Sequence, residues 1–149
     1  AFKGPADAKV TVIEYGSPTC PGCKRWNELY WPEVKRDYVD TGKIKFVFRE
    51  FAIHGAIDAG IFSVARCTGQ EEFFDVIDEA FVRQDQLVMA AQTGDAMPAL
   101  RELGAKFNLS AEQVNSCVDE ATLEMVKQGL YEKRGQIRLL WWGQYEASR

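Results

Sequence analysis

The chain has 149 residues, of which 46% are apolar and 27% are charged. This composition is typical of a globular protein with a hydrophobic core and excludes an intrinsically disordered chain. The formal net charge of -4 argues against nucleic acid or an anionic membrane surface as the main partner. No window reaches the roughly 18 apolar residues of a membrane span, and the first residues do not have the pattern of a signal peptide. We therefore expect one domain, or one core that carries an insertion, with no membrane insertion.

The first third of the chain predicts a strand, a helix and a second strand. β-branched and aromatic residues at positions 10–15 predict a buried strand. Apolar residues at helical spacing then predict a helix over 21–39, with a kink near Tyr30–Trp31 because Pro32 lies inside it. Residues 44–51 predict the second strand. A crossover of this length makes the two strands a parallel pair in a βαβ unit.

The next region has a helical period. Apolar stripes begin near Ile57, Phe73 and Leu100, and Ser110 starts the pattern of a capping box. Beyond these, the sequence predicts a helix over 121–132 and a short strand over 137–142. We therefore divide the chain into three parts: the first part of an α/β core at 1–55, a helical insertion at 56–128, and the remaining part of the core at 129–149.

Two cysteines, Cys20 and Cys23, lie three positions apart at the predicted junction of strand and helix. The first N–H groups of the helix and the positive end of its dipole favour the thiolate of Cys20, which is the nucleophile in disulfide exchange. Pro21 suits the first helical position because its missing N–H would have no helical partner there. Cys23, one turn deeper, can close a disulfide ring and release a mixed disulfide. The pattern predicts a redox-active dithiol without metal or cofactor. The alternatives are half of a zinc site, which needs two further ligands, and an inert structural disulfide.

Glu14 lies six residues before Cys20 in an otherwise apolar strand. If its side chain is buried beneath the dithiol, burial raises its pKa, and the carboxyl can transfer the proton of Cys23. If the side chain lies at the strand edge, it is an ordinary solvated carboxylate. Both interpretations remain open. The pairing of the other two cysteines, Cys67 and Cys117, also remains open, because four cysteines allow three connectivities.

Residues 10–23 resemble the start of the DsbA-like oxidoreductases of the thioredoxin superfamily, which have an apolar strand, an acidic residue six positions before the first cysteine, and C-P-x-C. Residues 46–51 resemble the strand that follows in that family. The resemblance implies a thioredoxin-like fold with an inserted helical domain. It also implies a periplasmic thiol–disulfide oxidoreductase that introduces disulfides into exported proteins. Cys20 would attack and Cys23 would resolve. The implied partners are reduced, unfolded or exported polypeptides and a membrane-bound, quinone-linked reoxidase similar to DsbB.

The resemblance extends to a subgroup from α-proteobacteria that carries a second disulfide in the helical domain. Cys67 and Cys117 match that pair, which implies a structural disulfide between them. An oxidising compartment would join two such thiols, and a closed loop of this length stabilises a fold. The alternative is two buried free thiols that act as small hydrophobic side chains.

The sequence departs from the family pattern in two places. Gly22 occupies a position where the best-known oxidases of the family have a histidine that stabilises the thiolate. His54 is expected in a loop beyond the second strand, and not as a substitute. We therefore expect weaker oxidising power, which leaves a reductase or isomerase of the same fold as an alternative.

The second departure concerns the cis-proline loop, which faces the dithiol and binds substrate backbone in this fold. The sequence has no proline after Pro98, and Arg138 runs directly into the last predicted strand. We expect the cis-proline loop and the final helix of the family to be missing. A non-catalytic peptide-binding or chaperone-like module is the alternative that this absence favours. Pro18, Trp26 and either Trp141 or Trp142 are expected to line a shallow apolar substrate groove around Cys20, and core or helix packing is the alternative for each tryptophan.

Overall fold

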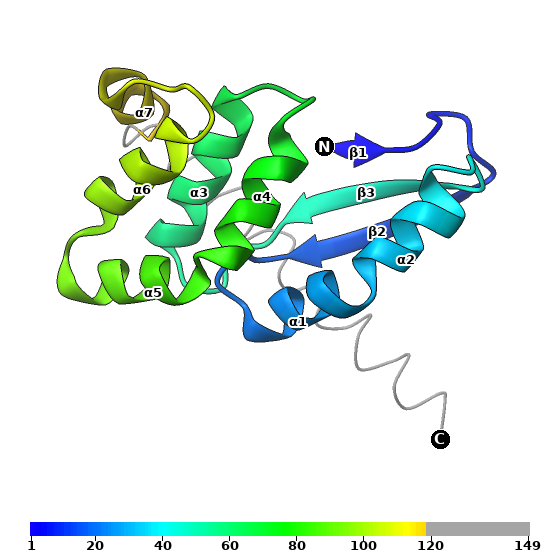
Figure 1. The fold of residues 1–149 in the computed structure, drawn as a ribbon, viewed down its shortest axis with the longest axis horizontal. Coiled ribbons are helices and arrows are strands. Elements are labelled where there is room, and N and C mark those ends of the chain that lie inside the picture. Colours follow the sequence, from blue (N-terminus) through cyan, green and yellow to red (C-terminus); the bar gives the residue numbers. More distant parts are fainter. Residues whose placement is uncertain (119–149) are drawn as a thin grey trace.

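Within the described residues, three strands form a mixed sheet in the order β1-β3-β2 (Figure 1). The computed structural model describes residues 1–118. Strand β2 (Val10–Gly16) pairs in parallel with β3 (Ile44–Glu50), which confirms the predicted βαβ unit. Strand β1 (Phe2–Lys3) pairs antiparallel with the other edge of β3. The sequence did not predict β1, because two residues are too short to show a strand period.

The two longer strands differ in burial. In β3, Phe46 and Phe48 are almost fully buried. In β2, Val10 and Ile13 are about half exposed, at 53% and 48%. The prediction that residues 10–15 form a buried strand is therefore wrong for the described part of the chain. Within the described residues, β2 is an edge strand that pairs only with β3, whereas the aromatic core surrounds β3, the central strand.

The crossover between β2 and β3 is helical but interrupted. Helix α1 (Pro21–Leu29) ends at Tyr30, and α2 (Trp31–Val34) continues into a π-helical turn, η1 (Lys35–Val39). The predicted kink is confirmed, since proline has no N–H to continue the hydrogen bonds of α1. Gly42 then has a φ of 74°, in the left-handed region that favours glycine, and the chain turns there into β3.

In the part of the chain that the structure describes, five helices follow β3. Figure 1 shows them gathered beyond the carboxyl ends of β2 and β3. They are α3 (Ala56–Cys67), α4 (Phe73–Val82), α5 (Gln84–Thr93), α6 (Ala96–Ala105) and α7 (Ala111–Cys117). The predicted capping box is confirmed: the Ser110 hydroxyl accepts from the N–H of Gln113, and the Gln113 side chain accepts from the N–H of Ser110.

One hydrophobic core joins the helical block to the sheet. Phe48 on β3 packs against Phe62 of α3 and against Phe73 and Phe74 of α4, with ring centroids 6.0–6.4 Å apart. Strand β3 and the helices after it therefore hold one another in place. None of the described helices is long and apolar enough to cross a membrane.

The structure locates the start of the helical block at α3, next to the boundary that we place between residues 55 and 56. The boundary between residues 128 and 129 lies outside the described residues. So do the helix predicted over 121–132, the strand predicted over 137–142, and the positions at which the cis-proline loop and the final helix are expected to be missing. The three-part division stays a prediction.

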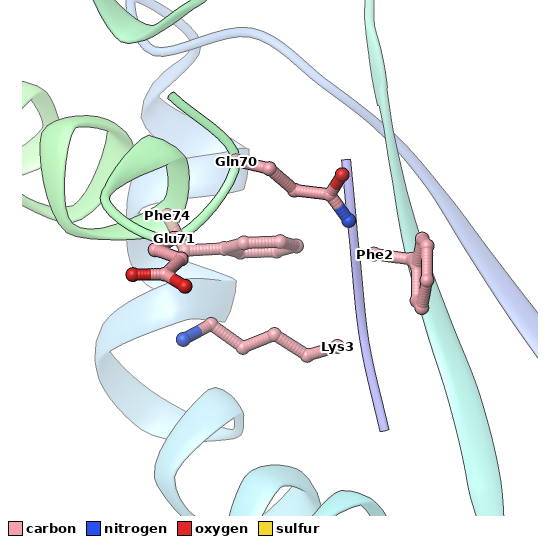
Figure 2. A pocket seen from close by; sticks show the side chains of 5 residues that line it. All are labelled: Phe2, Lys3, Gln70, Glu71 and Phe74. Carbon is pink, nitrogen blue, oxygen red and sulfur yellow. The ribbon is translucent and has the colours of Figure 1, made fainter. Parts of the chain in front are cut away.

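An open pocket of about 380 Å³ lies between β1 and the start of α4 (Figure 2). Lys3 extends from β1 along the ring of Phe74, with its Nζ 5.1 Å from the ring centroid, and Gln70 and Glu71 complete the wall opposite the strand. No cysteine lines this pocket. The chemistry that the sequence predicts must therefore lie elsewhere in the fold.

Candidate redox site

The sulfur of Cys20 lies at the beginning of a helix. Cys20 is the N-cap residue of α1 in an extended conformation, Pro21 is the first helical residue, and no side chain caps this end. A Cβ atom placed on Gly22 would be 3.7 Å from Cys20 Sγ, so the first turn of α1 wraps around the sulfur. The unpaired N–H groups and the dipole of α1 therefore favour negative charge at this site.

Cys23 has a different environment from Cys20. Both thiols are free and half-buried. Burial raises the pKa of Cys23 to about 12, although a backbone hydrogen bond from Ser17 acts in the opposite direction. The negative charge of Glu14 raises the Cys23 pKa further. Cys23 is thus held as a thiol, which is what the second, resolving position of a dithiol requires before it is oxidised.

Glu14 is half-buried in β2, close enough to Cys23 for the two groups to interact electrostatically. Burial, followed by the negative charge of Asp78, raises the pKa of Glu14 from 4.5 to about 7. Burial likewise raises the pKa of Asp78 on α4, although Asn27 Nδ2 on α1 donates a hydrogen bond of 2.9 Å to its carboxylate. A carboxyl that titrates near neutral pH can both give and accept a proton under ordinary conditions.

The four residues before the helix, Ser17 to Cys20, form a tight and largely buried turn. The N–H of Cys20 donates to the carbonyl of Ser17 at 3.1 Å. Ser17 and Thr19 are only 1% and 2% exposed, and Pro18 is buried as well. The expectation that Pro18 lines an exposed groove is wrong, because helices after β3 cover the turn. Trp26 is half-buried and stacks on Phe46 with centroids 5.9 Å apart.

A carboxylate from α3 lies behind this turn. Asp58 is fully buried, and its Oδ1 accepts from the hydroxyls of Ser17 and Thr19, at 2.9 and 2.7 Å, and from the N–H of Thr19 at 3.2 Å. Its Oδ2 accepts from the N–H of His54 at 2.9 Å. The ring nitrogen Nδ1 of His54 is 2.7 Å from the Thr19 hydroxyl. His54, expected as a loop residue without a role at the dithiol, thus contacts the residue directly before Cys20.

A second buried polar group reaches the turn from α5. Gln84 is 4% exposed, and its Nε2 donates to the carbonyl oxygens of Pro18 and Cys20 at 2.7 and 3.1 Å. Sequence reasoning missed both Asp58 and Gln84. The only signal was a polar residue on an otherwise apolar helix face, as with Asp58 between Ile57 and Ile61, and such a residue does not reveal its partner.

The other two cysteines lie in the helical block, away from this turn. A disulfide joins Cys67, at the end of α3, to Cys117, at the end of α7, with Cα atoms 6.2 Å apart and 50 residues between them in sequence. Cys67 is exposed and Cys117 is half-buried. The pair therefore does not consist of two buried free thiols in this structure.

The thioredoxin family model matches residues 1–133. The chain belongs to this family. Among curated relatives, "Putative protein-disulfide oxidoreductase" of Rickettsia bellii is 33% identical over 119 residues, which are 78% of this chain and 44% of the relative. "Disulfide bond formation protein D" of Bacillus subtilis is 42% identical over 52 residues, 35% of this chain and 23% of the relative. The chain thus spans less than half the length of these relatives.

Solved structures agree on the fold. Wolbachia pipientis alpha-DsbA1 superimposes with a TM-score of 0.81 at 22% sequence identity. The superposition covers 91% of this chain and 68% of the Wolbachia chain. BdbD from Bacillus subtilis gives a TM-score of 0.74 at 22% identity, with 92% and 75% covered. The thioredoxin-like fold with helices inserted after β3, as predicted, is confirmed.

Proposed function

We propose that this chain is a thiol–disulfide oxidoreductase that uses Cys20 and Cys23 to introduce disulfides into other proteins. The observation that carries the proposal is the contrast between two neighbouring thiols. Cys20 is the N-cap of α1, at a helix start that no side chain caps, whereas Cys23 lies one turn deeper, where burial raises its pKa to about 12. The names of the relatives from Rickettsia and Bacillus describe the same chemistry.

In the oxidised enzyme a substrate thiolate attacks Cys20 Sγ. The Cys20–Cys23 bond breaks, a mixed disulfide forms at Cys20, and the electron pair leaves on the sulfur of Cys23. A second substrate thiolate then attacks the substrate sulfur of the mixed disulfide and releases Cys20 as a thiolate. Two electrons pass from two substrate thiols to the enzyme, and the substrate gains one disulfide. In this cycle the free Cys20 and Cys23 thiols would be the reduced form of the enzyme.

Glu14 serves as the proton carrier of Cys23 in this proposal. With a pKa of about 7, its carboxyl is partly protonated at neutral pH and can protonate the departing Cys23 thiolate. During reoxidation the carboxylate takes the proton back, so that Cys23 can attack. Pro21 and Gly22 support this cycle by shaping the first helical turn around Cys20.

The partners follow from this chemistry. The substrates would be reduced, unfolded or exported polypeptides, and a membrane-bound, quinone-linked protein similar to DsbB would reoxidise the dithiol. We place the protein in the bacterial periplasm, an oxidising compartment that would also preserve the Cys67–Cys117 disulfide. That disulfide would have a structural role.

Gly22 is the observation that favours a second candidate, a reductase or isomerase with the same site. A side chain at this position would begin 3.7 Å from Cys20 Sγ, but glycine has none. The Cys20 thiolate therefore lacks the charge or hydrogen-bond donor that a histidine side chain would supply. A less stable thiolate makes the disulfide less oxidising.

Two assays test the function and its direction. Catalytic amounts of the oxidised protein should accelerate the refolding of a reduced, denatured substrate, and the Cys20→Ser variant should not. Equal rates with both proteins would exclude the enzyme. Equilibration with glutathione gives the direction of the exchange reaction. A strongly reducing potential would exclude the oxidase and support the reductase.

A further inference from the structure

We propose that Asp58 and Gln84 are positioning residues through which the helical insertion sets the reactivity of Cys20. Both side chains are buried, and both belong to helices that follow β3 in sequence. Both side chains bond the turn that carries the attacking cysteine. Asp58 is 39–41 residues from its partners along the chain, and Gln84 is 64–66 residues from its partners. The inference rests on the redox role of Cys20 proposed above, and it extends that role to the helical block.

Asp58 restrains the turn from behind. A fully buried carboxylate needs several donors to replace its lost hydration, and here the turn supplies three of them to Oδ1. The Ser17 and Thr19 hydroxyls each have one hydrogen, and both are given to Asp58 at this geometry. The His54 ring nitrogen must then donate to the Thr19 hydroxyl, which completes the polar cluster. This cluster restricts Thr19, the residue that precedes Cys20.

Gln84 restrains the turn from the other helix. Its single amide nitrogen donates to the carbonyl groups on both sides of Thr19, at Pro18 and at Cys20. The carbonyl of Cys20 also accepts the N–H of Lys24, the first full hydrogen bond of α1. Gln84 therefore contacts the oxygen at which the turn becomes a helix, and it fixes how the first turn of α1 meets Cys20.

Both sulfurs depend on this turn. Ser17, whose hydroxyl bonds Asp58, acts through its backbone on Cys23 and lowers the pKa of that thiol. Cys20 is the last residue of the turn and the N-cap of α1. A turn that relaxes moves the sulfur of Cys20 relative to the helix start, and an electrostatic interaction with a helix end falls off within one turn. The thiolate is then less stabilised, and the dithiol becomes a weaker oxidant.

The test compares Gln84→Leu with Gln86→Leu, the same substitution two residues along α5. Gln86 is exposed and bonds only Glu102 on α6 within the described residues, at 2.9 Å. Two quantities are measured on the reduced full chain: the alkylation rate of Cys20 by iodoacetamide across pH, and the equilibrium constant with glutathione. We expect Gln84→Leu to lower the alkylation rate at neutral pH about three- to tenfold and to shift the equilibrium towards the oxidised enzyme by a similar factor. Gln86→Leu should change neither.

Thr19→Val tests Asp58 without removing a buried charge, because valine keeps the shape of threonine and loses only the hydroxyl that bonds Asp58 and His54. It should change both quantities in the same direction as Gln84→Leu, and it replaces that variant if Gln84→Leu does not fold. Normal alkylation profiles and equilibrium constants in folded variants, with only a loss of thermal stability, would overturn the inference. Alkylation does not require a protein substrate, so a failure of the proposed function in the refolding assay would be seen separately.

Discussion

The two cysteine pairs of this protein are built in opposite ways. Cys20 and Cys23 are three residues apart, and one helix turn places them together as free thiols. Cys67 and Cys117 are 50 residues apart, and the packing of α3 and α7 brings them into a disulfide. A short ring closes at little entropic cost, whereas a long loop restricts the unfolded chain strongly. This difference accords with the proposal that the first pair cycles between dithiol and disulfide and that the second stabilises the fold.

The largest predicted effect concerns trapping at the first pair. Cys23→Ser removes the resolving sulfur and leaves Cys20 at its helix start, so mixed disulfides with an activated thiol reagent should accumulate. Cys20→Ser should form almost none, a difference of at least about a hundredfold if Cys20 is the thiolate that attacks. Non-reducing electrophoresis measures both variants. Equal trapping by the two would mean that the assignment of attacking and resolving cysteines is wrong.

The second pair should matter for stability alone. Replacing Cys67 and Cys117 together by alanine should lower the free energy of unfolding by up to about 4 kcal/mol, the value that the chain-entropy model gives for a loop of this length. Chemical denaturation measures this loss. Exchange activity of the folded variant should stay within about twofold of the native value, as expected for a structural crosslink far from the reacting sulfurs. A large loss of activity at full stability would reverse the comparison.

Glu14→Gln tests the proton carrier beside the first pair. The folded-state pKa of about 7 lies above the ordinary 4.5, so the folded protein binds this proton more tightly and loses stability as the pH rises from about 4.5 to 7. Glutamine removes that loss, and the variant should be more stable than the native protein above pH 7 by about 1–3 kcal/mol.

The same variant should reoxidise Cys20 and Cys23 about tenfold more slowly, because the general base of Cys23 is gone. The native reoxidation rate should rise through pH 7, and the Glu14→Gln profile should be flat in that range. Stopped-flow fluorescence against an oxidised thiol reagent measures both profiles. A native profile with no rise near pH 7 would remove Glu14 from the mechanism.

Gly22→His should make the Cys20–Cys23 pair more oxidising and so increase the difference in redox potential between this pair and the Cys67–Cys117 disulfide. A side chain at this position starts 3.7 Å from Cys20 Sγ, an ordinary contact, so histidine fits and its ring can donate to the thiolate. We expect the glutathione equilibrium to become about tenfold more oxidising, equal to roughly 30 mV for a two-electron couple. Gly22→Ala is the matched control. Identical potentials for the histidine and alanine variants would show that this position does not tune Cys20.

The smallest effect is expected at Asp78, which acts on the dithiol only through Glu14. Asp78→Asn removes a negative charge that raises the Glu14 pKa, so the midpoint of the pH profile should move down by less than about one unit. Asp75→Asn on the same helix is the control. Asp75 is exposed, and it raises the pKa of Asp78 but is not among the charges that raise the pKa of Glu14. A midpoint that moves upward in Asp78→Asn would contradict the electrostatic account.

Local sequence patterns predicted the local parts of the structure. The kink at Tyr30, the start of α1 at Pro21 and the capping box at Ser110 each depend on residues within one helical turn. The parallel pairing of β2 with β3 followed from the length of the crossover. These features are encoded by spacing and by the chemistry of proline and helix caps, which a single sequence displays.

The sequence could not show which distant side chains meet. Asp58 and Gln84 reach Thr19 and its neighbours only after α3 and α5 have packed around the sheet. The residues near Cys20 in the sequence do not indicate that these two side chains will bond the turn. The exposure of Val10 and Ile13 is likewise a property of strand order, which puts β2 beside β3 alone among the described strands. Whether an apolar strand is buried depends on the elements that pack against it, and the composition of the strand does not reveal those elements.

Stepwise reduction of the fully oxidised protein tests the difference between the two pairs most directly. The protein is treated with increasing concentrations of a mild thiol reductant, free thiols are alkylated, and peptides are mapped by mass spectrometry. Cys20 and Cys23 should become labelled first, while Cys67 and Cys117 stay joined until the fold is lost, because α3 and α7 hold their ends together. Release of the Cys67–Cys117 disulfide before or together with Cys20–Cys23 would contradict the account.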